Sequence, residues 1–213
     1  MPRILSFTDR LIGQFDNALR TLTPGAVSAG TQSPAHAVAQ TELSDAERRH
    51  SVGLMRINHS GEVCAQGLYQ GQALTARLPT VRAKMTLAAQ EELDHLAWCD
   101  QRLQELQGRT SWMNPIFYGL SFGLGALAGA AGDRYSLGFV AATEDQVSHH
   151  LSDHLQQIEH IDGRSTAVLE QMLADERQHE AQALAAGGIE FSPPVKQFMT
   201  GVSKLMTKVT YYI

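Results

Sequence analysis

The chain has 213 residues, a formal net charge of −5, and 43% hydrophobic but only 7% aromatic residues. This length is enough for one domain with a sizeable core. The acidic balance, with no concentrated basic region, argues against a nucleic-acid-binding face.

The first predicted element is a short amphipathic helix over residues 4–20. Its apolar side chains are Ile4, Leu5, Leu11, Ile12, Phe15 and Leu19. Residues 21–43 are rich in Thr, Ser, Ala, Gly and Pro, which is typical of a linker. We therefore divide the chain into an N-terminal amphipathic segment and linker, residues 1–43, and a helical domain, residues 44–213.

Four long helices are predicted in the second part, and no stretch shows the alternation of a half-buried strand. Ser44 and Glu47 form a capping box, Pro79 is a plausible stop, and Thr80 is expected to cap the next helix. We expect helices over residues 44–78, 80–107, 133–161 and 165–186, followed by a last segment from residue 193. One long connection between two helix pairs is the topology of an all-α, ferritin-like four-helix bundle.

Two Glu-x-x-His frames indicate the chemistry. Each is preceded by a lone glutamate, thirty residues upstream in the first case and thirty-two in the second. Residues at i and i+3 of a helix face the same way, ~4.5 Å apart along the axis, so the Glu and His of one frame can reach one metal or adjacent metals. The six candidate metal ligands, through which catalysis would also act, are Glu62, Glu92, His95, Glu144, Glu176 and His179.

These positions interrupt otherwise apolar helical seams, most cleanly in the second, third and fourth predicted helices. Four glutamates buried together would be very costly without compensation, and two divalent cations would balance their charge. Oxygen-rich ligation with one imidazole per metal suits iron or manganese better than zinc. Two residue pairs of matching spacing also suggest an internal duplication. The nine histidines of the chain agree with a metal site.

Other polar residues carry weaker signals. Acids flank the candidate ligands as surface groups or as hydrogen-bond partners of the imidazoles: Glu91, Asp94, Asp145 and Asp175. Tyr69 is interpreted as a core tyrosine, with a redox role as the alternative. The roles of His149, His150 and His154 stay open. Cys64 and Cys99 are interpreted as free thiols, with a disulfide as the alternative.

Residues 112–132 contain no charged side chain and are rich in glycine and alanine. We favour a surface segment that enters the membrane interface, anchored by Trp112, Phe117, Tyr118 and Phe122. A buried crossover helix is the main alternative, and a true membrane span is the least favoured.

The motifs together resemble the bacterial form of the demethoxyubiquinone hydroxylase family. They are Asn58-His59-Ser60-Gly61-Glu62, Glu91-Glu92-Leu93-Asp94-His95, Thr143-Glu144 with His149-His150, and Asp175-Glu176-Arg177-Gln178-His179. The resemblance covers most of the chain and includes all six candidate ligands. Under this resemblance Glu92 and Glu176 are the expected bridging carboxylates and Glu62 and Glu144 the terminal ones, but the sequence itself does not separate these roles.

The resemblance implies a non-haem di-iron monooxygenase of ubiquinone biosynthesis. Its cofactors would be two iron ions per chain, with O₂ as co-substrate and either NADH or a quinol as reductant. Its substrate would be a polyprenylated methoxy-methyl-benzoquinol. It would attach peripherally to the cytoplasmic face of the cell membrane, where other ubiquinone-biosynthesis proteins are potential partners.

Other functions on the same fold stay as alternatives. A ferritin-like or rubrerythrin-like protein would handle iron or peroxide, and a radical-forming reductase subunit would need a tyrosine near the metals. A quinone-binding scaffold would need no catalysis. A tRNA hydroxylase is disfavoured by the acidic balance.

Overall fold

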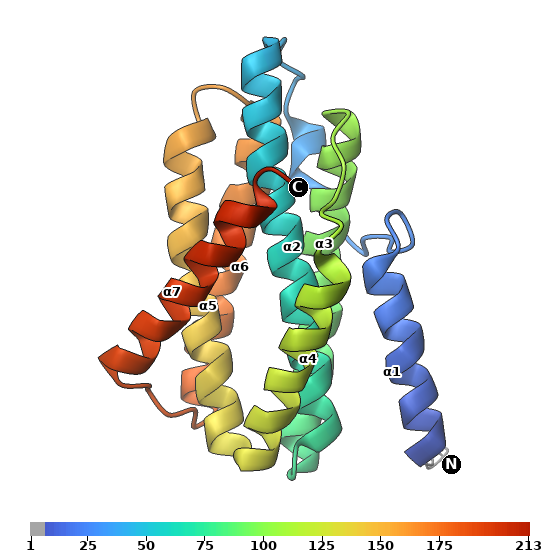
Figure 1. Cartoon of the computed structure of the whole chain (residues 1–213), viewed down its shortest axis with the longest axis vertical. Helices are drawn as coiled ribbons and strands as arrows, with labels where there is room; N and C mark the ends of the chain where they lie inside the picture. Colours follow the sequence, from blue (N-terminus) through green and yellow to red (C-terminus); the bar gives the residue numbers. More distant parts are fainter. Residues whose placement is uncertain (1–6) are drawn as a thin grey trace.

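The computed structural model describes residues 7–213 and is helical throughout, without strands in that range (Figure 1). Ile4 and Leu5 of the first predicted helix lie outside the described residues. The elements are α1 (Phe7–Leu22), the 3₁₀ turn η1 (Pro34–Ala37), α2 (Asp45–Thr75), α3 (Pro79–Glu105), α4 (Asn114–Ala131), α5 (Asp133–Ile158), α6 (Gly163–Ala185) and α7 (Pro193–Thr210).

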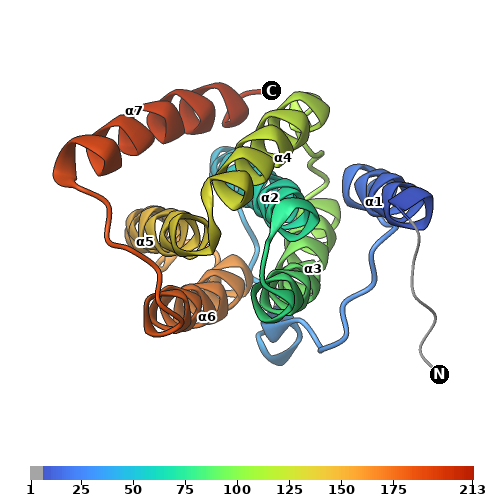
Figure 2. The same cartoon turned by 90° about the horizontal axis from the view of Figure 1, so that it is seen from below.

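The predicted four-helix bundle is confirmed, with α2 and α3 as one helix pair and α5 and α6 as the other. Seen from below, α4 and α7 lie along one side of this bundle, and α1 lies outside it, next to α2 and α3 (Figure 2). Helix α4 is the long connection between the pairs, and it packs closely along α2. Buried side chains such as Met55, Leu103, Leu151 and Met172 fill one end of the interior.

The helix boundaries follow local chemistry. Ser44 caps α2 through the predicted capping box, because its side chain accepts the N–H of Glu47 while Glu47 accepts the N–H of Ser44. The prediction that Thr80 caps α3 was wrong, since Leu78 is the cap and Pro79 is the first helical residue. Proline suits that position because its φ is already helical and its missing N–H would have no partner there.

Residues 23–44 form an irregular strap, interrupted by η1, that is hydrogen-bonded to α3. Asp94 accepts bonds from the Gly30 N–H at 2.6 Å and the Thr31 hydroxyl at 2.5 Å. Asp100 accepts the N–H of Gly25 at 2.6 Å. The strap is therefore fixed against the outer face of α3, which composition alone does not reveal.

The charge-free segment forms the crossover helix α4. Its glycines allow close approach to α2, since a Cβ at Gly125 would lie 2.9 Å from the carbonyl carbon of Leu68. Of the four predicted anchors, Trp112 is exposed, whereas Tyr118 is buried and donates a hydrogen bond to Gln70 at 2.5 Å. The prediction that Tyr118 is an outward-facing membrane anchor was therefore wrong. Among the residues described, no helix has the length and apolarity to cross a bilayer.

Both cysteines are free thiols, with Cys99 buried and Cys64 half-buried, so the favoured interpretation is confirmed. Cys99 Sγ lies 3.7 Å from Met172 Sδ in the core. Cys64 Sγ lies at the same distance from Met206 Sδ of α7.

Candidate metal centre

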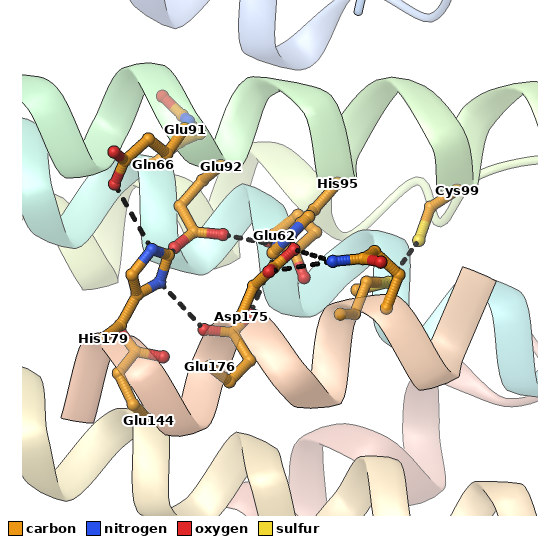
Figure 3. A network of polar contacts seen from close by, with 12 residues as sticks. Glu62, Gln66, Glu91, Glu92, His95, Cys99, Glu144, Asp175, Glu176 and His179 are labelled. Atoms are coloured by element: carbon orange, nitrogen blue, oxygen red, sulfur yellow. Dashed lines mark hydrogen bonds and ion pairs between the residues drawn. The ribbon is translucent and has the colours of Figure 1, made fainter. Parts of the chain in front are cut away.

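The six candidate ligands converge in the bundle interior from four helices (Figure 3). Their fractional exposure is 3% or less for five of them, and the His179 side chain is 12% exposed. Helix α2 contributes Glu62, α3 contributes Glu92 and His95, α5 contributes Glu144, and α6 contributes Glu176 and His179. In four of these residues, ligand atoms lie within 4.8 Å of one another: Glu62, Glu92, His95 and Glu176.

Glu92 and Glu176 lie between the two imidazoles. Glu92 places Oε2 at 2.8 Å from His95 Nδ1 and Oε1 at 2.9 Å from His179 Nδ1. Glu176 does the same, at 3.3 Å and 3.4 Å. A carboxylate with one oxygen toward each imidazole has the arrangement that bridges two cations.

The other two glutamates lie at opposite ends of the cluster. Glu62 approaches His95, with 4.0 Å between Oε2 and Nδ1. Glu144 lies at the His179 end in Figure 3, and it accepts a hydrogen bond from the buried Tyr69 hydroxyl. The cluster therefore consists of two similar ends with two shared carboxylates between them.

Each imidazole is oriented by an acid from the opposite helix pair. His95 Nε2 lies 3.1 Å from Asp175 on α6, and His179 Nε2 lies 3.3 Å from Glu91 on α3. Such an acid holds the proton on Nε2 and leaves the Nδ1 lone pair free for a cation. The other two flanking acids serve elsewhere: Asp94 binds the strap, and Asp145 binds Lys196 at 2.9 Å.

The electrostatics of the cluster favour bound cations. Burial raises the pKa of Glu62 and of Glu144 well above the ordinary range, and repulsion from neighbouring glutamates raises both pKa values further. Burial lowers the pKa of His179, but the negative carboxylates of Glu176 and Glu92 beside its ring outweigh burial and raise that pKa to about 11. Without cations the cluster can therefore keep its charge balanced only by holding extra protons.

Three buried polar atoms test whether a cation fits the cluster. Within the described part of the chain, both carboxylate oxygens of Glu92 and the Nδ1 atom of His95 make close contacts with charged neighbours but no contact with the geometry of a hydrogen bond. An unpartnered buried polar atom costs free energy, and a cation between these atoms would remove that cost. The donor set of four carboxylates and two imidazoles suits a pair of hard or borderline divalent metals.

The remaining histidines fall outside this cluster. His154 is buried and lies 3.1 Å from Asn58, and His150 contacts Ser203 of α7 at 2.7 Å. His149 is exposed on α5. The sequence pattern did not single out Asn114, which joins α4 to Ser60 of α2 at 2.7 Å; an isolated asparagine in an apolar segment was its only signal.

A small apolar cavity of about 170 Å³ reaches one end of the cluster from between α3, α5 and α6. Tyr69 and His179 lie at its inner end, and Met85, Leu137 and Val140 are among its apolar walls. A second cavity, of about 440 Å³, lies under the strap between α3 and α6 and is lined by polar residues. Small molecules can therefore approach the cluster from two sides.

Comparison with known proteins gives consistent matches. The family model described as ubiquinone biosynthesis protein COQ7 matches residues 49–210. Proteins named 3-demethoxyubiquinol 3-hydroxylase from Ectopseudomonas mendocina and Azotobacter vinelandii are each 61% identical over 211 residues, covering 99% of this chain and 98% of theirs. A protein of the same name from Chromohalobacter salexigens is 60% identical over 211 residues, covering 99% of each chain.

Proposed function

The chain belongs to the family of the ubiquinone biosynthesis protein COQ7, and we propose that it is a di-iron monooxygenase that hydroxylates the ring of a demethoxyubiquinol. The substrate would be 2-polyprenyl-3-methyl-6-methoxy-benzoquinol. The observation that carries the proposal is the buried cluster of carboxylates and imidazoles, with polar atoms that a cation would satisfy.

Each residue of the cluster has a definite task in this proposal. Glu92 and Glu176 would bridge the two metals, while Glu62 with His95 and Glu144 with His179 would complete the two ends. When bound, the iron pair supplies the redox chemistry that activates O₂ for insertion of one oxygen atom into an aromatic C–H bond. The second oxygen atom leaves as water, which takes two electrons and two protons from a quinol, or from NADH and one proton of the solvent.

The protein around the cluster orients and shields it. Asp175 and Glu91 hold protons on the outer nitrogens of His95 and His179, which keeps both Nδ1 atoms aimed inward. Fully buried apolar side chains next to the cluster, such as Met172 and Leu169, exclude bulk water.

A direct assay tests the activity. Purified protein reconstituted with Fe(II) is expected to convert a demethoxyquinol to its hydroxylated product when given O₂ and a reductant. Mössbauer spectra of the same sample are expected to show about two coupled irons per chain, as the two ends of the cluster require. A coupled iron pair without any hydroxylated product would refute the proposed substrate.

We also propose attachment to the cytoplasmic face of the cell membrane, supported by the orientation of α7. This helix turns polar side chains toward α5: Lys196 binds Asp145 at 2.9 Å, and Thr200 binds Gln146 at 2.9 Å. Its apolar side chains face outward, with Phe198 73% exposed. Apolar side chains also face outward from α1 and α4: Ile12, Phe15, Leu19, Ile116, Leu120, Leu124 and Leu127.

Outward apolar faces on three helices suit insertion into a lipid interface, where a polyprenyl tail would also lie. Phe198→Ser is expected to reduce flotation with vesicles of mixed anionic and zwitterionic phospholipid. Leu87→Ser is the matched control, because Leu87 is a 59% exposed apolar residue on α3, which is not one of those three helices. Equal loss of flotation in both variants would contradict this membrane face.

The family match begins at residue 49, just after the division placed between residues 43 and 44. We propose that residues 44–213 form the catalytic domain and that residues 1–43 are an accessory segment, whose strap is hydrogen-bonded to α3.

A further inference from the structure

The two ends of the metal cluster are alike in their ligands but differ at one buried position. Tyr69 follows Glu62 by seven residues on α2, and Leu151 follows Glu144 by seven residues on α5. Both side chains are 0% exposed. Because two turns of helix separate each residue from its glutamate, they occupy matching places in the two helix pairs.

This difference gives only one of the outer glutamates a hydroxyl donor. The Tyr69 hydroxyl donates to Oε1 of Glu144, across the bundle from α2 to α5. Leu151 has no hydroxyl, and among the hydrogen bonds within the described part of the chain the bond from Tyr69 to Glu144 is the one that a hydroxyl donates to a candidate ligand. One oxygen of Glu144 is therefore engaged by a phenol, and Glu62 has no corresponding hydroxyl donor.

We propose that Tyr69 is a positioning residue that makes the two metal positions inequivalent, by restricting Glu144 to one ligating oxygen. The position served by Glu144 and His179 then has one protein oxygen fewer than the position served by Glu62 and His95. It binds its cation more weakly and keeps a coordination place that the protein does not fill. The inference rests on the metal pair of the proposed function and adds which of the two positions is the open one.

One of the two cavities agrees with this assignment. The apolar cavity of about 170 Å³ is lined by Tyr69 and His179 but by neither Glu62 nor His95, whereas the polar cavity of about 440 Å³ is lined by both His95 and His179. The more open metal position therefore lies beside this mainly apolar cavity, and Tyr69, which bonds to Glu144, is part of the cavity wall.

The test is a Co²⁺ titration of the full-length, chelator-stripped protein, followed by calorimetry and visible absorption. The unsubstituted protein is expected to bind two Co²⁺ in two resolved steps. In Tyr69→Phe, Glu144 is free to bind through both oxygens, so the weaker step is expected to tighten about tenfold toward the stronger one, as release of one charged hydrogen bond implies. Its absorption is expected to shift, because the coordination number of that Co²⁺ changes.

Tyr118→Phe is the matched control, because it removes a buried hydroxyl that is bonded to Gln70 rather than to the cluster. Its titration is expected to match that of the unsubstituted protein. In a Glu144→Gln background the side chain has no second carboxylate oxygen to release, so adding Tyr69→Phe is expected to change nothing further. If Tyr69→Phe does not fold, ultraviolet difference absorption of the unsubstituted protein replaces it, with a tyrosine signal expected at the weaker step only.

The outcomes separate the two proposals. Binding of fewer than two Co²⁺ by the unsubstituted protein would sink the metal pair and this inference together. Two bound Co²⁺ with identical titrations before and after Tyr69→Phe, or a weaker step that loosens further, would overturn the role of Tyr69 alone. A tyrosine signal that accompanies both steps equally, or neither, would overturn it as well.

Discussion

The close contact between α4 and α2 gives a sharp prediction, because two glycines of one helix face different surroundings. A Cβ at Gly125 would lie 2.9 Å from the carbonyl carbon of Leu68 and even closer to its oxygen, both of them backbone atoms. A Cβ at Gly123 would meet nothing within 4 Å. Alanine at position 125 therefore has to push the two helices apart, whereas alanine at position 123 does not.

The size of the effect follows from this geometry. Carbon atoms pack at ~3.5–4.0 Å, so the new Cβ at position 125 is roughly 0.6–1.1 Å too close to the Leu68 carbon. Overpacking of this kind costs about 1–3 kcal/mol. Both alanines gain about 0.5–1 kcal/mol of helix propensity, and that gain cancels when the two variants are compared. Gly125→Ala is therefore expected to be about 1–3 kcal/mol less stable than Gly123→Ala.

Thermal and urea unfolding of the two variants, stripped of metal in the same way, measure this difference. For a chain of this length it corresponds to a melting temperature lower by about 2–12 °C in Gly125→Ala. Gly123→Ala is expected to equal or exceed the unsubstituted protein. Equal stability of the two variants would refute the idea that the glycines of α4 serve close packing on α2.

Three further predictions concern buried charge, pH and metal. Arg102→Met is expected to lower the free energy of unfolding in urea by about 3–5 kcal/mol, because it leaves the buried Asp162 carboxylate without its partner at 2.7 Å. Adding Asp162→Asn should restore part of this stability, and a double variant no more stable than Arg102→Met would contradict the explanation. Burial, with the nearby His150 adding to it, lowers the pKa of His154 to about 4, so the unfolded chain binds more protons between pH 6.5 and 4 and stability falls as pH falls through that window. Relative to His154→Gln, the unsubstituted protein is therefore expected to lose about 2 kcal/mol between pH 7.5 and pH 5; the exposed His160 supplies a control substitution that should show no such difference. Removing metal with a chelator is expected to lower the melting temperature. Adding back the metal at 100 times its dissociation constant should raise the free energy of unfolding by about 2.7 kcal/mol. A melting temperature that does not change with metal would contradict the proposed metal centre.

The sequence carried the information for the bundle and the cluster because both depend on short-range periodicity. The spacing within each Glu-x-x-His frame is local to one helix, and the apolar seam of that helix indicates which of its faces is buried. The convergence of the six side chains follows from these two facts once the four helices assemble, while their role as ligands stays a prediction. The resemblance to a known family added the identity of the metal and of the substrate.

The features that the sequence did not predict depend on which helices become neighbours. The sequence offered Asp175 as a surface group or as the partner of an imidazole, but nothing local says that this imidazole is His95, since the two residues are on different helix pairs. Tyr118 and Trp112 look alike in an apolar segment, and only the packing of α4 on α2 separates the buried ring from the exposed one. The tie between Asp94 and the strap likewise joins segments far apart in the chain.

The crossed placement of the two orienting acids affects how the protein matures. Each hairpin carries its own glutamates and one histidine, but the group that sets the proton on that histidine belongs to the other hairpin. A half-made or misdocked chain therefore presents imidazoles without the acids that orient them and only three of the six candidate ligands. If these side chains hold the metal pair of the proposed function, metal binding would require that both hairpins have already joined, and loading would report on assembly.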